Sequence, residues 1–360
     1  MVLLIALWIS SLTIIEQDGI VQVIVIEIMW PRPNTLLGKL KDNMTNYVMV
    51  TGAAGYIGGQ TALMLKDQGY EVIGVDLRPT PELLENVFTH YFQSDFSDQQ
   101  VLNTIAQYQP RAIVHCAGTS LVGPSLANPS YYYHNNFVKT KIMADFLVDA
   151  KIATRLIFSS TAAIYGDPVM TPCSEFDPPM PISPYGESKL MVEIMLNSYH
   201  RAYGLDSVIF RYFNACGADH LIRHGQADDA THIMACLLKS IKDNQPFVLN
   251  GNSYPTADGT CVRDYVHVED IAQAHILAIN TAVPSGVYNL GNNVGTSNQQ
   301  VIDMVGVVTD CKPQVEVGKA RSGDPAELFA DSLRFREASG WIPKYALRDM
   351  IQHAWAWCNR

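Results

Sequence analysis

A tyrosine and a lysine spaced four residues apart are the residues in this sequence best suited to acid–base chemistry. Tyr185 and Lys189 follow a Ser-Pro pair typical of a helix start, and their spacing places both side chains on one helix face. Because an ammonium group stabilises a nearby phenolate, we expect the pKa of Tyr185 to be lowered and the residue to act as a base near neutral pH. Thr161 follows an apolar run at 155–158, so its hydroxyl would lie at a strand end and could bond the reacting oxygen.

Three glycines predict a dinucleotide site. Gly52, Gly55 and Gly58 lie in Thr-Gly-Ala-Ala-Gly-Tyr-Ile-Gly, directly after an apolar run and at the start of a helical pattern. This spacing permits a tight turn, approach of the backbone to a pyrophosphate and close packing of helix on strand. Asp76 ends the next apolar run, where a carboxylate accepts ribose hydroxyls and repels a 2′-phosphate. The site therefore favours NAD over NADP, while Arg78 argues mildly the other way.

These motifs require a sheet whose strands all end at the same edge. Apolar runs alternate with stretches of helical length, which predicts an α/β fold with a Rossmann-type, doubly wound parallel sheet. The strands are expected at 47–50, 71–75, 112–116, 155–158 and 207–210, and the helices at 60–68, 99–108, 136–150 and 184–203.

The second half of the chain has a looser pattern. A long loop is expected at 250–260, with helices at 229–242, 269–280, 298–309 and 347–357. We interpret 44–215 as the NAD-binding domain and 216–360 as a smaller α/β substrate-binding domain, with some exchange of chain between them.

Composition excludes several classes of protein. The 360 residues carry a net charge of −10, which lacks the basic field that nucleic acids attract. The seven cysteines are scattered without a Cys-x-x-Cys pair, so we expect no disulfide framework, no metal site and a reducing, cytoplasmic location.

Residues 1–43 are interpreted as an N-terminal extension of unknown role. Two apolar stretches are separated by Glu16-Gln17-Asp18, so neither reaches the ~20 residues of a membrane span. The features of a signal peptide are absent. A weak interfacial anchor is the alternative interpretation.

The motifs together resemble the extended short-chain dehydrogenase/reductase family and, within it, the UDP-glucose 4-epimerases. The likeness covers about Thr45 to Arg360. It rests on the glycine motif and on His-Cys-Ala-Gly at 115–118, Ser-Ser-Thr-Ala-Ala-Ile-Tyr-Gly at 159–166, Ser-Pro-Tyr-Gly-Glu-Ser-Lys at 183–189, Arg-Tyr-Phe-Asn at 211–214 and Arg-Ser-Gly-Asp-Pro at 321–325. The segment Asp-Gly-Thr-Cys-Val-Arg-Asp-Tyr-Val-His-Val at 258–268 is the most specific to the 4-epimerases.

The resemblance implies an isomerase that interconverts UDP-galactose and UDP-glucose with tightly bound NAD. Thr161, Tyr185 and Lys189 would form the catalytic trio. The residues expected to hold NAD are Gly52, Gly55, Tyr56, Ile57, Gly58, Asp76, Asp95, Phe96, Ala117, Gly118, Asn136, Ser159, Tyr185, Lys189 and Tyr212. Those expected to hold the UDP-hexose are Thr161, Asn214, Arg263, Arg321 and Asp324. The family also implies a homodimer through the helices at 136–150 and 184–203.

Departures from the family pattern leave alternatives open. Ser120 stands where some members have a lysine, and Leu328 lines the sugar pocket where a tyrosine rejects N-acetylated sugars. Ala162 and Ala163 replace the acids that elimination of water requires, which disfavours a dehydratase. A 4-epimerase for UDP-N-acetylhexosamines, UDP-pentoses or UDP-glucuronate remains an alternative, as does a non-catalytic NAD sensor.

Overall fold

The computed structural model describes residues 12–17, 20–25, 46–228, 230–321 and 323–360. The chain divides into two compact units, Met1–Met44 and Thr45–Arg360. In the first unit, β1 (Leu12–Gln17) and β2 (Ile20–Val25) pair as an antiparallel hairpin. The rest of the predicted extension lies outside the described residues.

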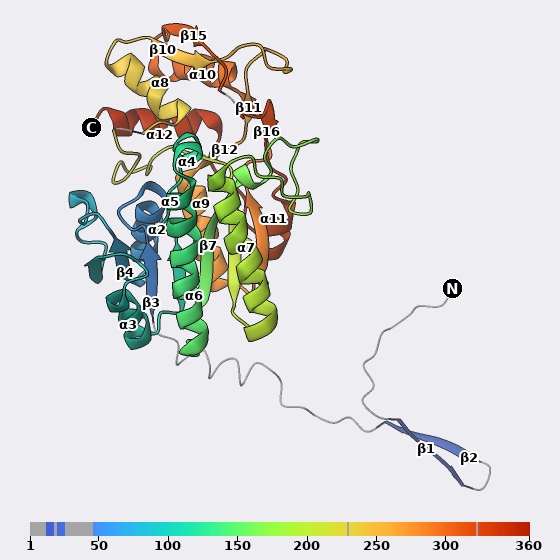
Figure 1. Ribbon diagram of the computed structural model, residues 1–360. Coiled ribbons are helices and arrows are strands. Elements are labelled where there is room, and N and C mark those ends of the chain that lie inside the picture. Colours follow the sequence, from blue (N-terminus) through green and yellow to red (C-terminus); the bar gives the residue numbers. More distant parts are fainter. Residues whose placement is uncertain (1–11, 18–19, 26–45, 229, 322) are drawn as a thin grey trace. The chain divides into compact units, whose positions relative to one another are not determined.

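A seven-stranded parallel sheet forms the centre of the second unit (Figure 1). Its strand order is β13-β8-β7-β6-β3-β4-β5, so the predicted Rossmann-type sheet is confirmed. The strands are β3 (Tyr47–Thr51), β4 (Glu71–Asp76), β5 (His90–Gln93), β6 (Ala112–His115), β7 (Arg155–Thr161), β8 (Ser207–Tyr212) and β13 (Gly286–Leu290). The edge strand β13 comes from the C-terminal half of the sequence, beyond the boundary placed at residue 215.

Helices cover both faces of the sheet, because successive strand residues point to opposite sides. Val48 and Val50 of β3 pack in one core, and Met49 packs in the other. The first face is covered by α2 (Tyr56–Asp67), α9 (Val268–Asn280) and α11 (Leu333–Ser339). The second is covered by α3 (Gln99–Tyr108), α6 (Lys139–Asp149) and α7 (Pro184–Tyr203).

The helix that carries Tyr185 and Lys189 has clear start and stop signals. Ser183 caps α7 by accepting a hydrogen bond from the backbone N–H of Gly186, and Pro184 occupies the first helical position. Gly204 ends the helix in the left-handed conformation. The bounds predicted at 184–203, 99–108 and 298–309 agree with the structure.

Other predicted bounds were wrong. The helix expected at 60–68 begins at Tyr56, because the third glycine of the motif lies inside its first turn. The helix expected at 136–150 begins as a π-helical turn, η2 (Tyr133–Val138), and continues as α6. Two short helices precede it, α4 (Val122–Ala127) and α5 (Pro129–Tyr132).

A second, smaller core lies at the carboxyl edge of the sheet (Figure 1). It contains α8 (Ile233–Lys242), α10 (Asn298–Thr309), α12 (Leu347–Cys358) and the parallel pair β10 (Phe247–Asn250) and β15 (Val315–Gly318). Two further small sheets connect it to the large one: β9 (Asn214–Cys216) with β12 (Tyr265–His267), and β11 (Val262–Arg263) between β14 (Thr296–Ser297) and β16 (Glu327–Leu328). Single-turn helices η1 (Glu82–Leu84) and η3 (Ala162–Ile164) complete the fold. Among the described residues, none of the helices combines the length and apolar character that crossing a membrane requires.

Candidate active site

The glycine turn leaves no space for side chains. Gly52 has φ +71°, and a Cβ there would lie 2.7 Å from the backbone nitrogen of Ala117. A Cβ on Gly58 would lie 2.2 Å from the carbonyl oxygen of Gly52. Gly55 is the N-cap of α2, and no side chain bonds the N–H groups of the first turn. The turn therefore presents bare backbone at a helix N-terminus, which fits the pyrophosphate of NAD.

Asp76 lies beside this turn at the end of β4. One carboxylate oxygen accepts a hydrogen bond from the N–H of Ala54, and the other accepts from the backbone N–H of Arg78. The Arg78 guanidinium is 3.2 Å from the carboxylate and is largely exposed. Asp76 therefore lies beside the glycine turn, where its predicted role in binding a ribose requires it, and its guanidinium partner is largely exposed.

Asp95 and Phe96 follow β5 at the same edge of the sheet. Asp95 pairs with Lys139 of α6 at 2.5 Å and accepts hydrogen bonds from Ser97. Burial acts to raise the pKa of Asp95, but the bonds from Lys139 and Ser97 outweigh it, so the pKa is lowered and the carboxylate is ionised. Phe96 is buried edge-on against His115.

Three predicted cofactor residues converge on one point. A Cβ on Gly118, whose φ is +150°, would lie 3.0 Å from Asn136 Oδ1 and 3.3 Å from Lys189 Nζ. The Asn136 side chain accepts from the N–H of Thr119 and donates to the carbonyl oxygen of Thr119 and to Ser188 Oγ. Asn136 therefore joins the segment after β6 to α7 at the residue that precedes Lys189.

Thr161, Tyr185 and Lys189 also come together. All three side chains are buried, and the hydroxyl of Thr161 is hydrogen-bonded to that of Tyr185. Lys189 Nζ donates to the carbonyl oxygen of Ser159 at 2.9 Å and lies 4.8 Å from the centre of the Phe158 ring. The end of β7 thus supplies the hydroxyl, and α7 supplies the phenol and the ammonium.

The expected lowering of the pKa of Tyr185 was wrong for the chain alone. Burial raises the pKa of Tyr185, and the hydrogen bond from Thr161 only partly opposes this. Burial also lowers the pKa of Lys189 to about 8. Desolvation disfavours both charged forms and outweighs the predicted effect of the lysine.

Ser159 and Tyr212 lie behind the lysine on neighbouring strands. Their hydroxyl oxygens are 2.9 Å apart. Tyr56 and Ile57 differ from these residues, because their side chains point into the protein: the Tyr56 hydroxyl donates to the carbonyl oxygen of Gly217, and Ile57 packs in the core. For both residues, only the backbone at the start of α2 could make the predicted contact with NAD.

The predicted substrate residues gather beyond the sheet. Arg263 of β11 lies 4.0 Å from Asp324, and the backbone N–H of Asp324 donates to the carbonyl oxygen of Arg321. The Arg321 guanidinium lies within 3.2 Å of the Asn250 side-chain oxygen once that amide is oriented to accept. Asn214 begins β9 and donates its N–H to the carbonyl oxygen of Asp264. A guanidinium beside a carboxylate, with a second arginine three residues before that carboxylate, suits a nucleoside diphosphate.

Two buried histidines were missed as site residues. His115 Nδ1 lies 2.6 Å from Thr51 Oγ, and its Nε2 lies 2.9 Å from Thr140 Oγ. It therefore joins the glycine turn to the helix that follows Asn136. A histidine inside a short apolar run was the signal in the sequence. His275 of α9 contacts Tyr212, and its place in the helical pattern gave no such signal.

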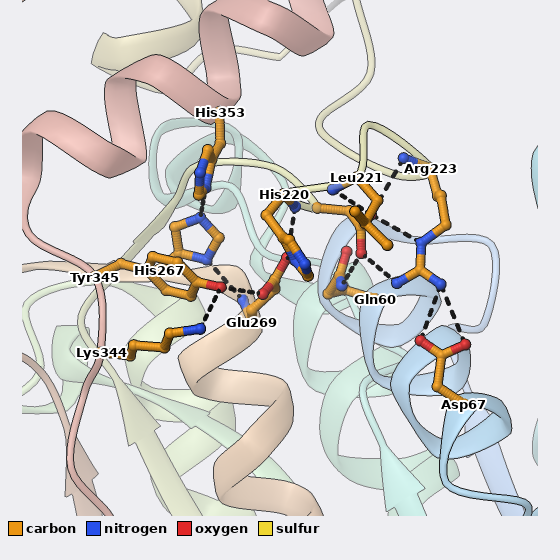
Figure 2. A network of polar contacts seen from close by, with 11 residues as sticks. Gln60, Asp67, His220, Leu221, Arg223, His267, Glu269, Lys344, Tyr345 and His353 are labelled. Carbon is orange, nitrogen blue, oxygen red and sulfur yellow. Dashed lines mark hydrogen bonds and ion pairs between the residues drawn. The ribbon is translucent and has the colours of Figure 1, made fainter.

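A polar network of different character lies at the start of α9 (Figure 2). Asp219, His220 and Glu269 have ligand atoms within 4.8 Å of one another, the spacing of a metal site. Donors of the chain already occupy these carboxylates, since Asp219 binds Arg223 and Gln60 and Glu269 binds His220 and Tyr345. A cation would have to displace Arg223, so we assign the network to packing of α2 against the start of α9.

Comparison with known proteins identifies relatives of the whole second unit. The family model of the NAD-dependent epimerase/dehydratase family matches residues 48–291. A UDP-glucose 4-epimerase of Halalkalibacterium halodurans is 39% identical, with 86% of this chain and 95% of that protein covered. The crystal structure of a UDP-glucose 4-epimerase from Bifidobacterium longum, in complex with NAD+ and UDP, superimposes with a TM-score of 0.81 at 31% identity, covering 87% of this chain and 98% of that chain. One from Brucella ovis, in complex with NAD, gives 0.80 at 36% identity, covering 87% and 98%.

The chain belongs to the NAD-dependent epimerase/dehydratase family. Within this family, its relatives place it with the UDP-glucose 4-epimerases, so the resemblance stated from the motifs is confirmed.

Proposed function

We propose that this chain is a UDP-glucose 4-epimerase that interconverts UDP-galactose and UDP-glucose through a 4-keto sugar. The observation that carries the proposal is the meeting of Thr161, Tyr185 and Lys189 with Gly118 and Asn136 at the end of β7. A trio of hydroxyl, phenol and ammonium against a bare backbone platform suits the oxidation of a secondary alcohol, in which a hydride leaves the carbon atom and a proton leaves its hydroxyl oxygen.

Each residue of the trio has a distinct task. Tyr185 accepts the proton of the sugar 4-hydroxyl as carbon 4 is oxidised, and returns it after the sugar has turned over. Thr161 holds the reacting oxygen beside the phenol. When bound, NAD supplies the hydride acceptor and donor at its nicotinamide, whose positive charge favours the phenolate that burial disfavours. Lys189 adds a second cation on the same side.

The substrate must be held firmly at one end and loosely at the other. Arg263 and Arg321 would bind the diphosphate, while Asp324 and Asn214 would bind the nucleoside. The hexose then turns about its diphosphate linkage, so that both faces of carbon 4 meet the same hydride site. Ala162 and Ala163 follow Thr161 and carry no acid, which disfavours elimination of water from the intermediate.

Sugar specificity depends on Leu328 in this proposal. The side chain is half-buried and packs on a small core that includes Ala162 and Phe213. Leucine is smaller than the tyrosine of members that reject N-acetylated sugars, so a UDP-N-acetylhexosamine epimerase is the second candidate. Turnover of UDP-N-acetylgalactosamine by the native chain, and its loss in Leu328→Tyr, would favour that candidate.

We also propose a homodimer through η2, α6 and α7. These elements carry exposed apolar side chains at Val138, Ile142, Met191, Ile194 and Tyr203. Apolar residues in this number on neighbouring helices are typical of an interface. Light scattering should give a mass in solution twice that of one chain. The Ile194→Asp variant should give the mass of a single chain. A cytoplasmic location remains a prediction from the unpaired cysteines.

The decisive experiment is turnover of UDP-galactose by purified protein without added NAD, with the cofactor identified after denaturation. UDP-glucose as product, with about one NAD per chain, is the expected result. NAD without turnover would move the proposal to another UDP-sugar or to a sensor. Absence of NAD would contradict the proposal altogether.

A further inference from the structure

A buried histidine lies behind Ser159 and Tyr212, two of the residues expected to hold NAD, on the face of the sheet opposite α7. His275 belongs to α9 and has no exposed surface. Its Nε2 is 2.6 Å from the Tyr212 hydroxyl, and its Nδ1 is 2.9 Å from the carbonyl oxygen of Ile271. The Tyr212 hydroxyl in turn is 2.9 Å from Ser159 Oγ, which is 3.2 Å from Cys116 Sγ.

The direction of these hydrogen bonds follows from the bond between His275 and the carbonyl oxygen of Ile271. A carbonyl oxygen only accepts, so His275 Nδ1 must carry the proton that it donates to Ile271. Burial lowers the pKa of His275 to about 4, so the ring is neutral at pH 7 and its Nε2 has only a lone pair. The Tyr212 hydroxyl must therefore donate to His275, so toward Ser159 it can only accept, and the single proton of Ser159 Oγ is shared between Tyr212 and Cys116 Sγ.

The chain of bonds ends at the catalytic lysine. The backbone carbonyl oxygen of Ser159 accepts the hydrogen bond from Lys189 Nζ. Ser159 and Tyr212 belong to the adjacent strands β7 and β8. One imidazole thus contacts the tyrosine whose hydroxyl meets the Ser159 side chain, and the backbone carbonyl of the same serine anchors the lysine.

We infer that His275 is a positioning residue for the reaction: by accepting the proton of Tyr212, it fixes the Tyr212–Ser159 pair, which is expected to hold NAD. The inference rests on the proposed function. The alternative is a histidine that only fills space, since its ring packs edge-on against Phe210. The two roles differ in whether His275 acts through the hydroxyl of Tyr212.

A double-mutant cycle separates them. His275→Leu leaves the Tyr212 hydroxyl buried without an acceptor, and we expect kcat for UDP-galactose and the affinity for NAD each to fall about tenfold. Tyr212→Phe removes the hydroxyl itself. If His275 acts through that hydroxyl, adding His275→Leu to Tyr212→Phe should cause little further loss. Losses that multiply in the double variant would overturn the inference.

Two further variants control for stability. His275→Gln offers a carboxamide oxygen to Tyr212 and should restore most of the NAD affinity; failure to restore it in a folded protein would count against the inference. Tyr288→Phe deletes another buried hydroxyl, one that donates only to the carbonyl oxygen of Pro284. It should lower thermal stability without changing the affinity for NAD.

One measurement needs no variant. Selective ¹⁵N labelling of histidine should show the neutral Nδ1–H tautomer for His275, and the Nε2–H tautomer would overturn the inference. If the native chain binds NAD without turning over UDP-galactose, the proposed function fails while the cycle on NAD affinity still decides the role of His275. A native chain that does neither would overturn both.

Discussion

The cofactor half and the substrate half of the site are built on different principles. The cofactor residues stand at the ends of adjacent parallel strands, and buried hydrogen bonds join them to one another. The substrate residues stand on short strands and loops, and their closest charge pair, Arg263 with Asp324, is 4.0 Å apart. Arg321 is exposed and Asp324 is more than a third exposed.

This difference matches what the reaction demands of each half. A cofactor that is regenerated in every cycle is best held by a site that exists before binding, because preorganisation lowers the cost of binding. The substrate must enter and leave, and its sugar must turn. Charges that the fold leaves loosely paired are available to a diphosphate, so the ligand itself completes that half of the site.

The largest effect should come from the residue where the two halves meet. Tyr185→Phe removes the base but keeps the ring, so we expect turnover of UDP-galactose to fall by about 10³-fold while NAD stays bound. Steady-state kinetics and cofactor content check this. Tyr203→Phe, an exposed phenol on the same helix, is the matched control. A Tyr185→Phe enzyme with native kcat would sink the catalytic assignment.

The next effect tests whether the cofactor half is rigid. Gly58→Ala places a methyl group 2.2 Å from the carbonyl oxygen of Gly52, and backbone must move to admit it. Overpacking of this kind costs about 1–3 kcal/mol, so NAD content and thermal stability should both fall. Gly123→Ala is the control, because a Cβ there has open space. If Gly58→Ala retained full NAD, the turn would be more compliant than its geometry indicates.

A substitution in the substrate half should impair binding of the substrate while leaving NAD content and stability unchanged, the opposite of Gly58→Ala. Arg263→Ala removes a guanidinium from loosely paired charges, so the fold should be little affected. We expect kcat/KM for UDP-galactose to fall about 30-fold, mostly through KM, with NAD content unchanged, since a hydrogen bond to a charged group contributes about 1.5–3 kcal/mol. Lys319→Ala, the control, removes an exposed cation that lies two residues before Arg321 and outside the proposed site. Equal effects of the two substitutions would indicate general electrostatic attraction instead of a specific diphosphate contact.

The contrast between regular strands in the cofactor half and short strands in the substrate half also explains which parts of the fold and site the sequence could predict. The glycine turn, Asp76 and the Tyr185–Lys189 pair were predictable because strand and helix periods fix where such residues stand. The short strands β9, β11, β12, β14 and β16 were not, since strands of two or three residues leave no periodic pattern, although the helices between them were predicted. Edge strand β13 was missed for a related reason: its sheet partner β8 lies more than seventy residues earlier, and local patterning does not encode such pairing.

Charge states formed a second limit. The spacing of Tyr185 and Lys189 suggested a lowered pKa for the tyrosine, whereas burial raises it. Sequence shows which charges can be neighbours but not how much water each one loses. His275 was missed for the same reason, because only burial and partners distinguish a bridging histidine from a surface one, whereas His115 stood in an apolar run that could have indicated its burial.

The smallest effect concerns stability against acid. Burial lowers the pKa of His115 in the cofactor half to about 3, so its stabilising contribution is present above its unfolded pKa, about 6.5, and is lost as pH falls. By pH 5 that loss is about 2 kcal/mol. In the substrate half, bonds from Ser297 and Thr260 outweigh burial and lower the pKa of Asp258, whose contribution is lost only below about pH 4.

Denaturant unfolding at pH 7 and pH 5 tests whether the cofactor half loses stability before the substrate half as pH falls. His115→Gln should be less stable than the native chain at pH 7, yet its free energy of unfolding should fall less between the two pH values, by about 2 kcal/mol. Asp258→Asn should leave that interval unchanged, because the carboxylate stays ionised throughout. The opposite result would be a smaller loss of unfolding free energy between pH 7 and pH 5 in Asp258→Asn but not in His115→Gln. Acid would then destabilise the substrate half first, and the buried neutral imidazole of His115 would not account for the pH dependence.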